Sequence, residues 1–471
     1  MKHNSTITTI LAFSAFLAVG CGAAPDKTAS NQPPGYNPDA LFVNSIAPDR
    51  GLADPHTLYV DGRLYAMCGH DRDWDIVDFC RMDRWEMWST DNLVDWRYEL
   101  SIDSSETYIG DEDQCWAGDL AVKDGTYYWY FSNKNYSTGV MSAPSITGPW
   151  KDALGEPLLP SGIIGKGHPY DPEIYEEGGV YSIIFGAGQY WIATLGDDMI
   201  SLKDKPRQLM VYEADGVTRK GTGDKPCIFK RNDWFYLMWG EHYAMSRSLE
   251  GPYIYKGDFI HGGHGTVFQW RDGQWYSLQE QHETNAFYRG VQLRPIYFNE
   301  DDTVYIPEEN WEYPLPGRDY DYTHSRMGWR CEGGGTEVEW VSGGKDITKG
   351  YITGKVDRKG AIITSVPFIH TPIHLCKEFT IDLDNRSGAK MLRMALYTYS
   401  KDLKPYTRKA PQQVDWSAEE WITIPLEKGV QRLTIPTDRF TNCGDYLHQI
   451  AIQPMADLDS GEWAIDHILL K

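Results

Sequence analysis

The stretch KDGTYYWYFS, residues 123–132, places a tight turn before an alternating run of aromatic residues. A turn dipeptide between two short β-type segments is the local pattern of a β-hairpin. The pattern occurs five times in the chain: VDGRLYAMCG (60–69), KDGTYYWYFS (123–132), EEGGVYSIIFG (176–186), KRNDWFYLMWG (230–240) and WRDGQWYSLQE (270–280). We therefore expect five similar antiparallel units.

A second element follows several of these hairpins: a small polar residue, a turn and then an aromatic residue, as in STDNLVDW (89–96), SAPSITGPW (142–150) and SRSLEGPY (246–253). This element fits an outer strand that leads to the next unit. The hairpins begin 40 to 63 residues apart, which is typical of a β-propeller with one four-stranded sheet per repeat. The absence of long helical periodicity argues against an α/β barrel. We predict an all-β protein with a five-bladed β-propeller over residues 37–315.

The sequence changes character after the propeller. Residues 316–337 are polar and Gly-rich, which favours a linker. Residues 338–471 contain short alternating segments such as EFTIDLD (378–384) and EWAIDHILL (462–470), which favour a second all-β unit. The ending AIDHILL resembles the last strand of a jelly-roll module, and this resemblance implies a β-sandwich. Four tryptophans of the C-terminal part are candidates for a sugar-binding platform, with core packing as the alternative: Trp329, Trp340, Trp416 and Trp421.

Composition excludes several classes of function. The 471 residues contain 45 Lys and Arg against 67 Asp and Glu, a formal net charge of −22. Such a negative surplus repels phosphate backbones and anionic lipids, so we expect no nucleic-acid partner and no peripheral membrane patch. With 41% hydrophobic residues, the chain is also too apolar to be disordered overall.

The N-terminus has the pattern of an export signal. Lys2 and His3 precede an apolar run that ends at Cys21, in the string LAVGC (17–21). It resembles a bacterial lipoprotein signal, with residues 1–20 removed, Cys21 lipidated and residues 21–36 serving as a tether. This predicts a cell-envelope lipoprotein, facing the periplasm or the cell surface, that touches the membrane only through its lipid. Cleavage and secretion without an anchor is the alternative.

Seven cysteines remain after Cys21, and an odd number leaves at least one unpaired. Cys68, Cys80 and Cys115 lie close enough in sequence to include one disulfide, and no spacing is typical of a zinc site.

The strand before each turn is the candidate inner strand of its blade, and each carries a polar side chain at a similar distance from the turn. These are Asp54 in ADPHTLYVDG (53–62), Asp119 in WAGDLAVKDG (116–125), Asp171 in YDPEIYEEGG (170–179), Asp224 in GDKPCIFKRND (223–233) and His264 in GHGTVFQWRDG (263–273). Inner strands surround the channel, so we expect these groups to converge on its axis. Buried acids raise one another's pKa, so such a cluster favours chemistry over stability. Solvated turn acids, or a Ca²⁺ ion on the axis near His264, are the alternatives.

The order of these motifs resembles family 43 glycoside hydrolases, and the strings HGTVFQWRDGQWY (264–276) and YRGVQLRPIYFNEDDTV (288–304) are similar to the fifth blade of that family. The resemblance implies hydrolysis of arabinofuranosyl, xylosyl or galactosyl linkages with inversion, with no required cofactor beyond a candidate Ca²⁺. It assigns a role to each matching residue: general base to Asp54, tuning of the acid to Asp171, an axial position to His264, a pocket position to Arg289, and sugar contact to Trp116 and Asp119.

The general acid of the family is a Glu two residues before a Pro, and this chain has Asp224 there. Asp is one methylene shorter, and a displacement near an ångström can cost about 100-fold in rate. Three outcomes stay open: Asp224 acts, Glu241 or His242 replaces it, or the site is inactive. An inverting mechanism needs one ionised and one protonated carboxyl. We expect Asp54 to be ionised and the negative charge of Asp171 to raise the pKa of Asp224.

Loops near the expected pocket supply candidate sugar contacts, with solvated insertions as the alternative: His70, Asp71 and Trp74 in GHDRDWDIVDFCRMDRWEMW (69–88), His168 beside Asp171, and Gln189 with Trp191 in GAGQYW (186–191). The leading hypothesis is a glycosidase that removes a terminal sugar from a poly- or oligosaccharide. The alternatives are a catalytically silent glycan-binding propeller and an anhydro-galactosidase-like enzyme acting on algal glycans.

Overall fold

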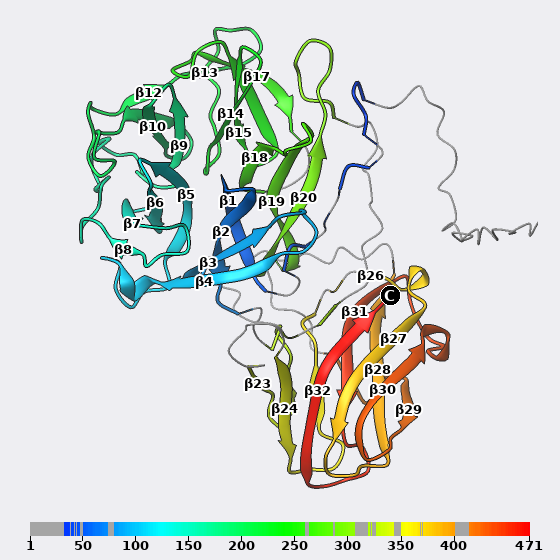
Figure 1. Ribbon diagram of the computed structural model, residues 1–471. Helices are drawn as coiled ribbons and strands as arrows, with labels where there is room; N and C mark the ends of the chain where they lie inside the picture. The colour runs from blue at the N-terminus through cyan, green and yellow to red at the C-terminus, as the bar shows by residue number, and fades with distance from the viewer. Residues whose placement is uncertain are drawn as a thin grey trace, which may run out of the picture.

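The computed structural model describes residues 33–37, 39–41, 43, 45–47, 50–73, 80–259, 263–285, 288–306, 319–320, 322, 326–342, 350–367, 369, 371–400 and 414–471. Strands form two bodies, a propeller from the N-terminal part and a sandwich from the C-terminal part (Figure 1). Their helical content is short 3₁₀ turns, η2 (Ser104–Glu106), η3 (Ile373–Leu375) and η4 (Thr437–Arg439). Within these ranges, no helix has the length and apolar character needed to cross a membrane.

Five antiparallel sheets form the propeller, which confirms the predicted fold class. The first contains β1 (Leu52–Val60), β2 (Arg63–Asp71), β3 (Met82–Thr90) and β4 (Arg97–Asp103), and the second β5 (Cys115–Lys123), β6 (Thr126–Asn133), β7 (Ser137–Ala143) and β8 (Lys151–Asp152). The third contains β9 (Glu173–Glu177), β10 (Val180–Phe185), β11 (Tyr190–Thr194) and β12 (Arg207–Leu209). The fourth contains β14 (Cys227–Arg231), β15 (Trp234–Trp239), β16 (His242–Ser246) and β17 (Tyr253–Asp258), with β13 (Val211–Tyr212) parallel to β17. The fifth contains β18 (Gly265–Gln269), β19 (Trp275–Asn285) and β20 (Tyr288–Ile296).

The N-terminal segment closes the ring. Val43 pairs antiparallel with Leu293 of β20, with N–H···O distances of 3.1 and 2.8 Å in the two directions. This contact adds the start of the chain to the last blade and covers its open edge.

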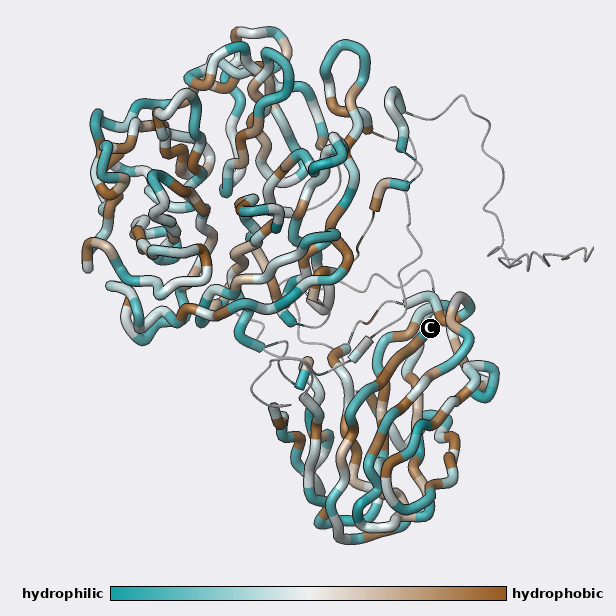
Figure 2. Tube along the Cα trace, viewed as in Figure 1, coloured by the Kyte–Doolittle hydropathy of each residue, from teal (hydrophilic) through white to brown (hydrophobic). Residues whose placement is uncertain are grey.

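The core of the propeller consists of five hydrophobic clusters, each between two neighbouring blades. The cluster between the first and second blades contains Trp85, Trp129 and Phe131, and the cluster between the fifth and first contains Trp88 and Tyr276. Figure 2 shows hydrophobic stretches along the strands and hydrophilic turns at their ends. The alternating aromatic residues of the repeats therefore hold the blades together.

Two sheets form the C-terminal sandwich. One has the order β23 (Glu339–Val341), β24 (Tyr351–Val356), β32 (Gly461–Leu470), β27 (Glu378–Asn385) and β30 (Gly429–Pro436), with β21 (Asp319–Tyr320) on β32. The other has the order β22 (Arg330–Glu332), β25 (Ile362–Thr364), β31 (Tyr446–Gln453), β28 (Met391–Tyr399) and β29 (Trp421–Pro425), with β26 (Thr371–Pro372) on β31. The side chains between the sheets form one hydrophobic core.

The predicted linker, 316–337, is wrong for much of its length. Asp319 and Tyr320 form a strand of the sandwich, and Tyr320, Tyr322 and Trp329 lie in its core. Their aromatic rings gain more from burial between the sheets than a linker position offers. Trp329 and Trp416 are buried and therefore lie in no exposed sugar platform, while the indole N–H of the partly exposed Trp340 donates to the Tyr322 carbonyl at 2.8 Å.

The expected disulfide is also wrong. All seven cysteines after Cys21 are free, including Cys68, Cys80 and Cys115. Cys68 and Cys115 instead fill core positions in the first two blades, where a thiol packs as a small apolar group. Cys21 and the export signal lie outside the described residues.

Candidate active site

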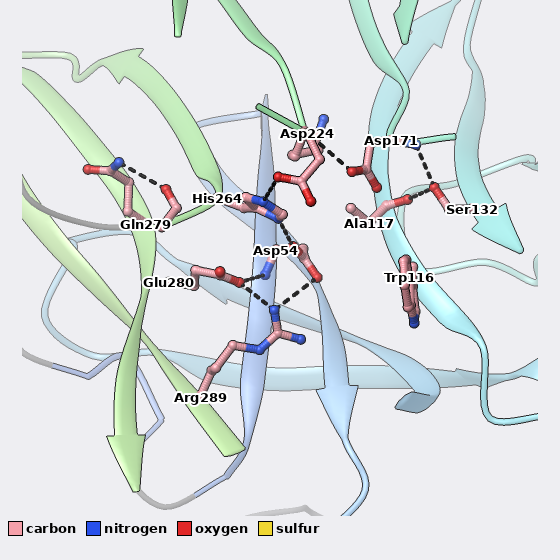
Figure 3. A network of polar contacts seen from close by, with 12 residues as sticks. Asp54, Trp116, Ala117, Ser132, Asp171, Asp224, His264, Gln279, Glu280 and Arg289 are labelled. Carbon is pink, nitrogen blue, oxygen red and sulfur yellow. Dashed lines mark hydrogen bonds and ion pairs between the residues drawn. The ribbon is translucent and has the colours of Figure 1, made fainter. Parts of the chain in front are cut away.

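Four predicted residues meet at one end of the propeller channel (Figure 3). Asp54, Asp171, Asp224 and His264 come from the beginning of the inner strands of the first, third, fourth and fifth blades. All inner strands run in the same direction along the channel, so their first residues share one end. The repeat therefore brings together side chains up to 210 residues apart in sequence.

A β-bulge directs Asp54 into the channel. The register of β1 on β2 shifts between Ala53 and His56, because Pro55 has no N–H to donate to the ladder. Asp54 has a φ of 49°, a left-handed conformation that non-glycine residues rarely adopt. Its carboxylate accepts a hydrogen bond from His264 Nδ1 at 2.6 Å, and its N–H donates to Glu280 Oε2 at 3.3 Å.

The environment of Asp54 keeps its carboxyl ionised. Burial alone would favour the neutral form, but Arg289 Nη1 lies 3.8 Å from Oδ2 and His264 donates to Oδ1, and together they lower the pKa below its usual range. A carboxylate that is buried and negatively charged at neutral pH is suited to accept a proton from water.

Arg289 is itself held from two sides. Its Nε and Nη2 donate to both carboxylate oxygens of Asp71 at 3.0 and 2.9 Å, and its Nη1 donates to Glu280 at 2.8 Å. Asp71 is completely buried in this pair, so the prediction that it contacts sugar is wrong: its carboxylate orients Arg289.

Asp171 lies opposite, in a protonation state unlike that of Asp54. Its φ is 56°, its N–H donates to Ser132 Oγ at 2.8 Å, and its Oδ2 accepts the backbone N–H of Lys225 at 2.9 Å. Burial, reinforced by the negative charges of Asp224 and Asp54, raises the pKa of Asp171 to about 7, although His264 opposes this. Asp171 therefore holds a proton up to neutral pH.

Asp224 is the most accessible acid of the group, with a side chain 49% exposed. It accepts a hydrogen bond from His264 Nε2 at 2.9 Å, and Tyr190 donates to its backbone carbonyl at 2.7 Å. Partial burial favours the neutral form, but the hydrogen bond from His264 lowers the pKa of Asp224. The expected rise in the pKa of Asp224 is therefore wrong, because the cationic ring of His264 outweighs the negative charges of the neighbouring carboxylates.

His264 occupies the space between Asp54 and Asp224. Burial opposes its charge, but Glu280 and the two hydrogen-bonded carboxylates raise its pKa well above the usual value, so both ring nitrogens donate. The next residue, Gly265, is required by space: a Cβ there would lie 2.3 Å from the Leu278 carbonyl oxygen. This close approach to β19 sets His264 at the channel mouth.

Aromatic residues border the site. The indole of Trp116 packs 6.0 Å from the ring of Tyr170 and donates to the Cys80 carbonyl at 2.9 Å. His168 is exposed and lies edge-on to Tyr170 at 6.4 Å. The predicted contacts Trp116 and His168 thus flank one aromatic ring beside Asp171.

Asp119 lies deeper in the channel than predicted. It accepts hydrogen bonds from the N–H of Ile174 at 2.5 Å and faces His56 Nδ1 at 2.8 Å. With Glu173 it lines a cavity of about 370 Å³ toward the opposite end of the inner strands. Burial raises the pKa of Asp119 to about 7. The predicted sugar contact is wrong here, because the side chain is buried and its oxygens are bound to His56 and to the N–H of Ile174.

Other predicted contacts bond elsewhere. His70 is buried against Asp83 at 2.9 Å and Arg84 at 3.1 Å, within the first blade, so it is not open to sugar. Gln189 is exposed and accepts a hydrogen bond from Gln208 at 2.5 Å.

Three further predicted residues lie in the outer parts of the third and fourth blades. Trp191 packs against the hydrophobic cluster between the second and third blades. His242 contacts Tyr255 at 3.0 Å on an outer strand, and the carbonyl of Glu241 accepts from Phe259 at 2.5 Å. Trp74 lies outside the described residues.

Sequence reasoning missed Glu280 and Lys225. Glu280 lies on the aromatic strand of the fifth repeat, opposite His264, and the antiparallel direction of that strand would have indicated its place at the channel mouth. Lys225 is flanked by Asp224 and Pro226, and no pattern indicated that a lysine side chain would turn into the core.

Two groups of residues have ligand atoms close enough to hold a metal ion: Asp54, His264 and Glu280, and His56, Asp119 and Glu173. In the first, the Arg289 guanidinium already contacts Glu280 at 2.8 Å, and in the second, Lys225 Nζ lies 3.3 Å from Glu173. Ca²⁺ prefers six to eight oxygen ligands. Each group thus has one histidine and one nitrogen cation beside its carboxylates, which fits that donor set poorly, so the group around His264 does not fit the expected Ca²⁺ ion.

Comparison with known proteins places the propeller in a family. Residues 44–304 match the family described as "Glycosyl hydrolases family 43". An arabinoxylan arabinofuranohydrolase of Paenibacillus polymyxa is 25% identical over 54% of this chain and 49% of that enzyme, so the match spans about half of that relative. A xylosidase/arabinosidase of Bacteroides ovatus is 22% identical over 55% of this chain and 95% of that enzyme.

A similar arrangement of both bodies exists in a solved structure. A family 43 arabinoxylan arabinofuranohydrolase of Bacillus subtilis, in complex with cellotetraose, aligns with a TM-score of 0.50 and 17% identity over 91% of this chain and 99% of that chain. At this identity the likeness concerns the fold alone.

Proposed function

The chain belongs to glycosyl hydrolase family 43, and from that premise we propose that it hydrolyses a terminal glycosidic bond of a poly- or oligosaccharide with inversion at the anomeric carbon. The observation that carries the proposal is the placement of Asp54 and Asp224 on opposite sides of His264, at hydrogen-bond distances of 2.6 and 2.9 Å. Two hydrogen bonds with an imidazole ring between them hold the carboxyl groups well apart, and inverting enzymes separate their carboxyl groups by about 6.5–9.5 Å.

Asp54 is the proposed general base. Its carboxylate takes a proton from the water that attacks the anomeric carbon, while Arg289 and His264 hold it ionised and oriented. His264 holds Oδ1 by a hydrogen bond at 2.6 Å, and Oδ2, which lies 3.8 Å from Arg289 Nη1, is the oxygen proposed to accept the proton of the water.

Asp224 is the proposed general acid, because it is the exposed carboxyl of the group. When the leaving-group oxygen takes the place of His264 Nε2, the hydrogen bond that lowers the pKa of Asp224 is lost. Burial under the substrate and the negative charge of Asp54 then raise that pKa. The proton moves from Asp224 to the glycosidic oxygen as the bond to the anomeric carbon breaks. Asp171, whose pKa is raised to about 7, keeps one proton within the Asp171–Asp224 pair below pH 7.

The substrate class follows from the aromatic border and from the family. Trp116 is partly exposed beside the acids and packs on the buried ring of Tyr170, so its indole is the face proposed to stack on a sugar ring. The relatives are named for arabinofuranosyl and xylosyl hydrolysis, so we propose an arabinofuranosyl, xylosyl or galactosyl terminus for this chain. The proposed chemistry uses carboxyl groups and water and requires no cofactor.

A second function is favoured by one observation. Asp224 is shorter than Glu and ion-paired to His264, which is also the arrangement expected of a propeller that binds glycan without cleaving it. Product analysis over a panel of natural oligosaccharides separates the two. Release of a monosaccharide supports hydrolysis, whereas binding without release supports a silent binder.

We also propose that the enzyme is exported and anchored to the cell envelope through Cys21. The apolar run that ends in LAVGC (17–21) supports this location. A Cys21→Ala variant should leave the membrane fraction and appear as soluble protein, and an unchanged membrane fraction would contradict the anchor.

A further inference from the structure

Lys225 follows the proposed acid Asp224, yet its side chain is completely buried in the propeller. Its Nζ donates to the Pro172 carbonyl at 2.6 Å, to the Pro226 carbonyl at 3.1 Å and to Glu173 Oε2 at 3.3 Å. An ammonium group has three protons, so every donor has an acceptor. Burying a charged group costs free energy unless the group is paired with an opposite charge and all of its hydrogen bonds are made.

These contacts join the loops that carry the two proposed acid-side residues. Pro172 directly follows Asp171, and Glu173 begins β9 of the third blade. The backbone N–H of Lys225 also donates to Asp171 Oδ2 at 2.9 Å. One residue of the fourth blade therefore contacts the Asp171 segment through both its backbone and its side chain.

The backbone of Lys225 is in an unfavourable conformation, with a φ of 23° in the left-handed region. Such a conformation in a non-glycine residue persists only where surrounding contacts determine it, and it is concentrated at functional sites. The buried ammonium supplies those contacts. Glu173 is fixed in turn, because its Oε1 accepts the N–H of Ile228 at 2.8 Å.

We infer that Lys225 is a positioning residue, whose buried ammonium sets the place of the Asp224 carboxyl relative to Asp171 and so compensates for the short side chain of the acid. The inference rests on the proposed hydrolytic function. Lys225 touches no substrate and acts through Asp224. In the same channel its charge balances Asp119 and Glu173, the acids that face it beside His56.

The test compares Lys225→Met with Lys230→Met. Lys230 lies on β14, the strand that Lys225 precedes, and pairs with Glu177 of β9, so it joins the same two blades, but at the exposed end. Because a misplacement near an ångström can cost about 100-fold, we expect Lys225→Met to lower kcat about 100-fold on a natural oligosaccharide with KM changed less than threefold. On an aryl glycoside with an excellent leaving group, which needs no general acid, the kcat of Lys225→Met should fall less than tenfold. Lys230→Met should keep the wild-type kcat on both substrates.

A double variant separates positioning from a general structural role. In an Asp224→Asn background the acid is already absent, so adding Lys225→Met should change kcat less than threefold. Independent, multiplicative losses would overturn the inference, and so would a Lys225→Met enzyme with the wild-type rate. If Lys225→Met does not fold, Lys225→Arg provides the test: it keeps the charge but not the three donor directions, and full kcat in this variant would also overturn the inference. A wild-type protein that releases no sugar would instead overturn the proposed function.

Discussion

His264 joins Asp54 to Asp224, donating from Nδ1 to the first at 2.6 Å and from Nε2 to the second at 2.9 Å. One cationic ring thereby keeps both carboxylates ionised in the unliganded site. In the proposed mechanism Asp54 is ionised from the outset, whereas Asp224 donates a proton only after the leaving-group oxygen replaces His264 Nε2 as its partner. The site therefore distinguishes its two carboxyl groups by their partners rather than by residue type.

Asp54→Asn should abolish sugar release. The amide cannot accept the proton of the attacking water, and loss of a general base lowers the rate by about 10²–10⁴-fold. Substrate affinity, measured by calorimetry with an oligosaccharide, should change less than threefold. Asp61→Asn is the matched control, since Asp61 is exposed just beyond the far end of the same strand and has the same φ of 49°. Equal activity of wild type and Asp54→Asn would contradict the assignment.

The general acid can be identified by leaving-group dependence. Asp224→Ala should lose about 10²–10⁴-fold on natural substrates and recover most of the rate on aryl glycosides with excellent leaving groups. Glu241→Ala and His242→Ala should retain wild-type activity, because the contacts of His242 are to Tyr255 and Asp258 on an outer strand. If Glu241→Ala or His242→Ala, and not Asp224→Ala, loses activity on natural substrates and regains it on aryl glycosides, that residue is the general acid instead.

The pH dependence of kcat/KM should follow Asp54 on the acidic side and Asp171 on the basic side. The lowered pKa of Asp54 keeps the base ionised throughout the mildly acidic range. Asp171 has a pKa raised to about 7, so above this pH the Asp171–Asp224 pair holds no proton to donate. The value of kcat/KM should then fall about tenfold per pH unit. A rate profile from pH 4 to 9 measures this, and a plateau that continues past pH 8 would be inconsistent with the role of Asp171.

Asp171→Asn should stabilise the fold most at high pH. The pKa of Asp171 is raised on folding, from 3.8 to about 7, so between these values the folded state keeps a proton that the unfolded chain releases. Its contribution to stability is full below pH 3.8 and is lost as pH rises through about 7. The neutral amide of Asp171→Asn avoids this loss. The difference in melting temperature between Asp171→Asn and wild type should therefore be larger at pH 8 than at pH 4, by about 2 °C or more. A gain that is equal at both pH values would show that the carboxyl is not perturbed.

The repeats were sufficient to predict the architecture. Each turn before an aromatic strand forms a hairpin in the structure, and a similar distance from the turn brings Asp54, Asp171, Asp224 and His264 to one end of the channel. The direction of the strands explains this success, because residues at equivalent places in a repeat reach the same end.

What the sequence did not predict depends on contacts between blades. Asp119 is two residues closer to its turn than Asp54 and Asp171 are to theirs, so it lies level with His56, and its carboxylate contacts His56 and the backbone of the third blade. Asp71 looked like a loop residue and is instead buried under Arg289, 218 positions away. Asp171 has the higher pKa and Asp224 the lower one because His264 contacts Asp224, and the sequence does not show which of the two acids this histidine contacts.

The configuration of the first product tests the central claim most directly. The wild-type protein is mixed with an oligosaccharide carrying a terminal arabinofuranosyl or xylosyl unit, and the anomeric signals of the released sugar are followed by ¹H NMR before mutarotation. The first sugar released should have the configuration opposite to that of the bond cleaved, and none should appear with Asp54→Asn. Release with retained configuration, or release that continues without Asp54, would contradict the central claim.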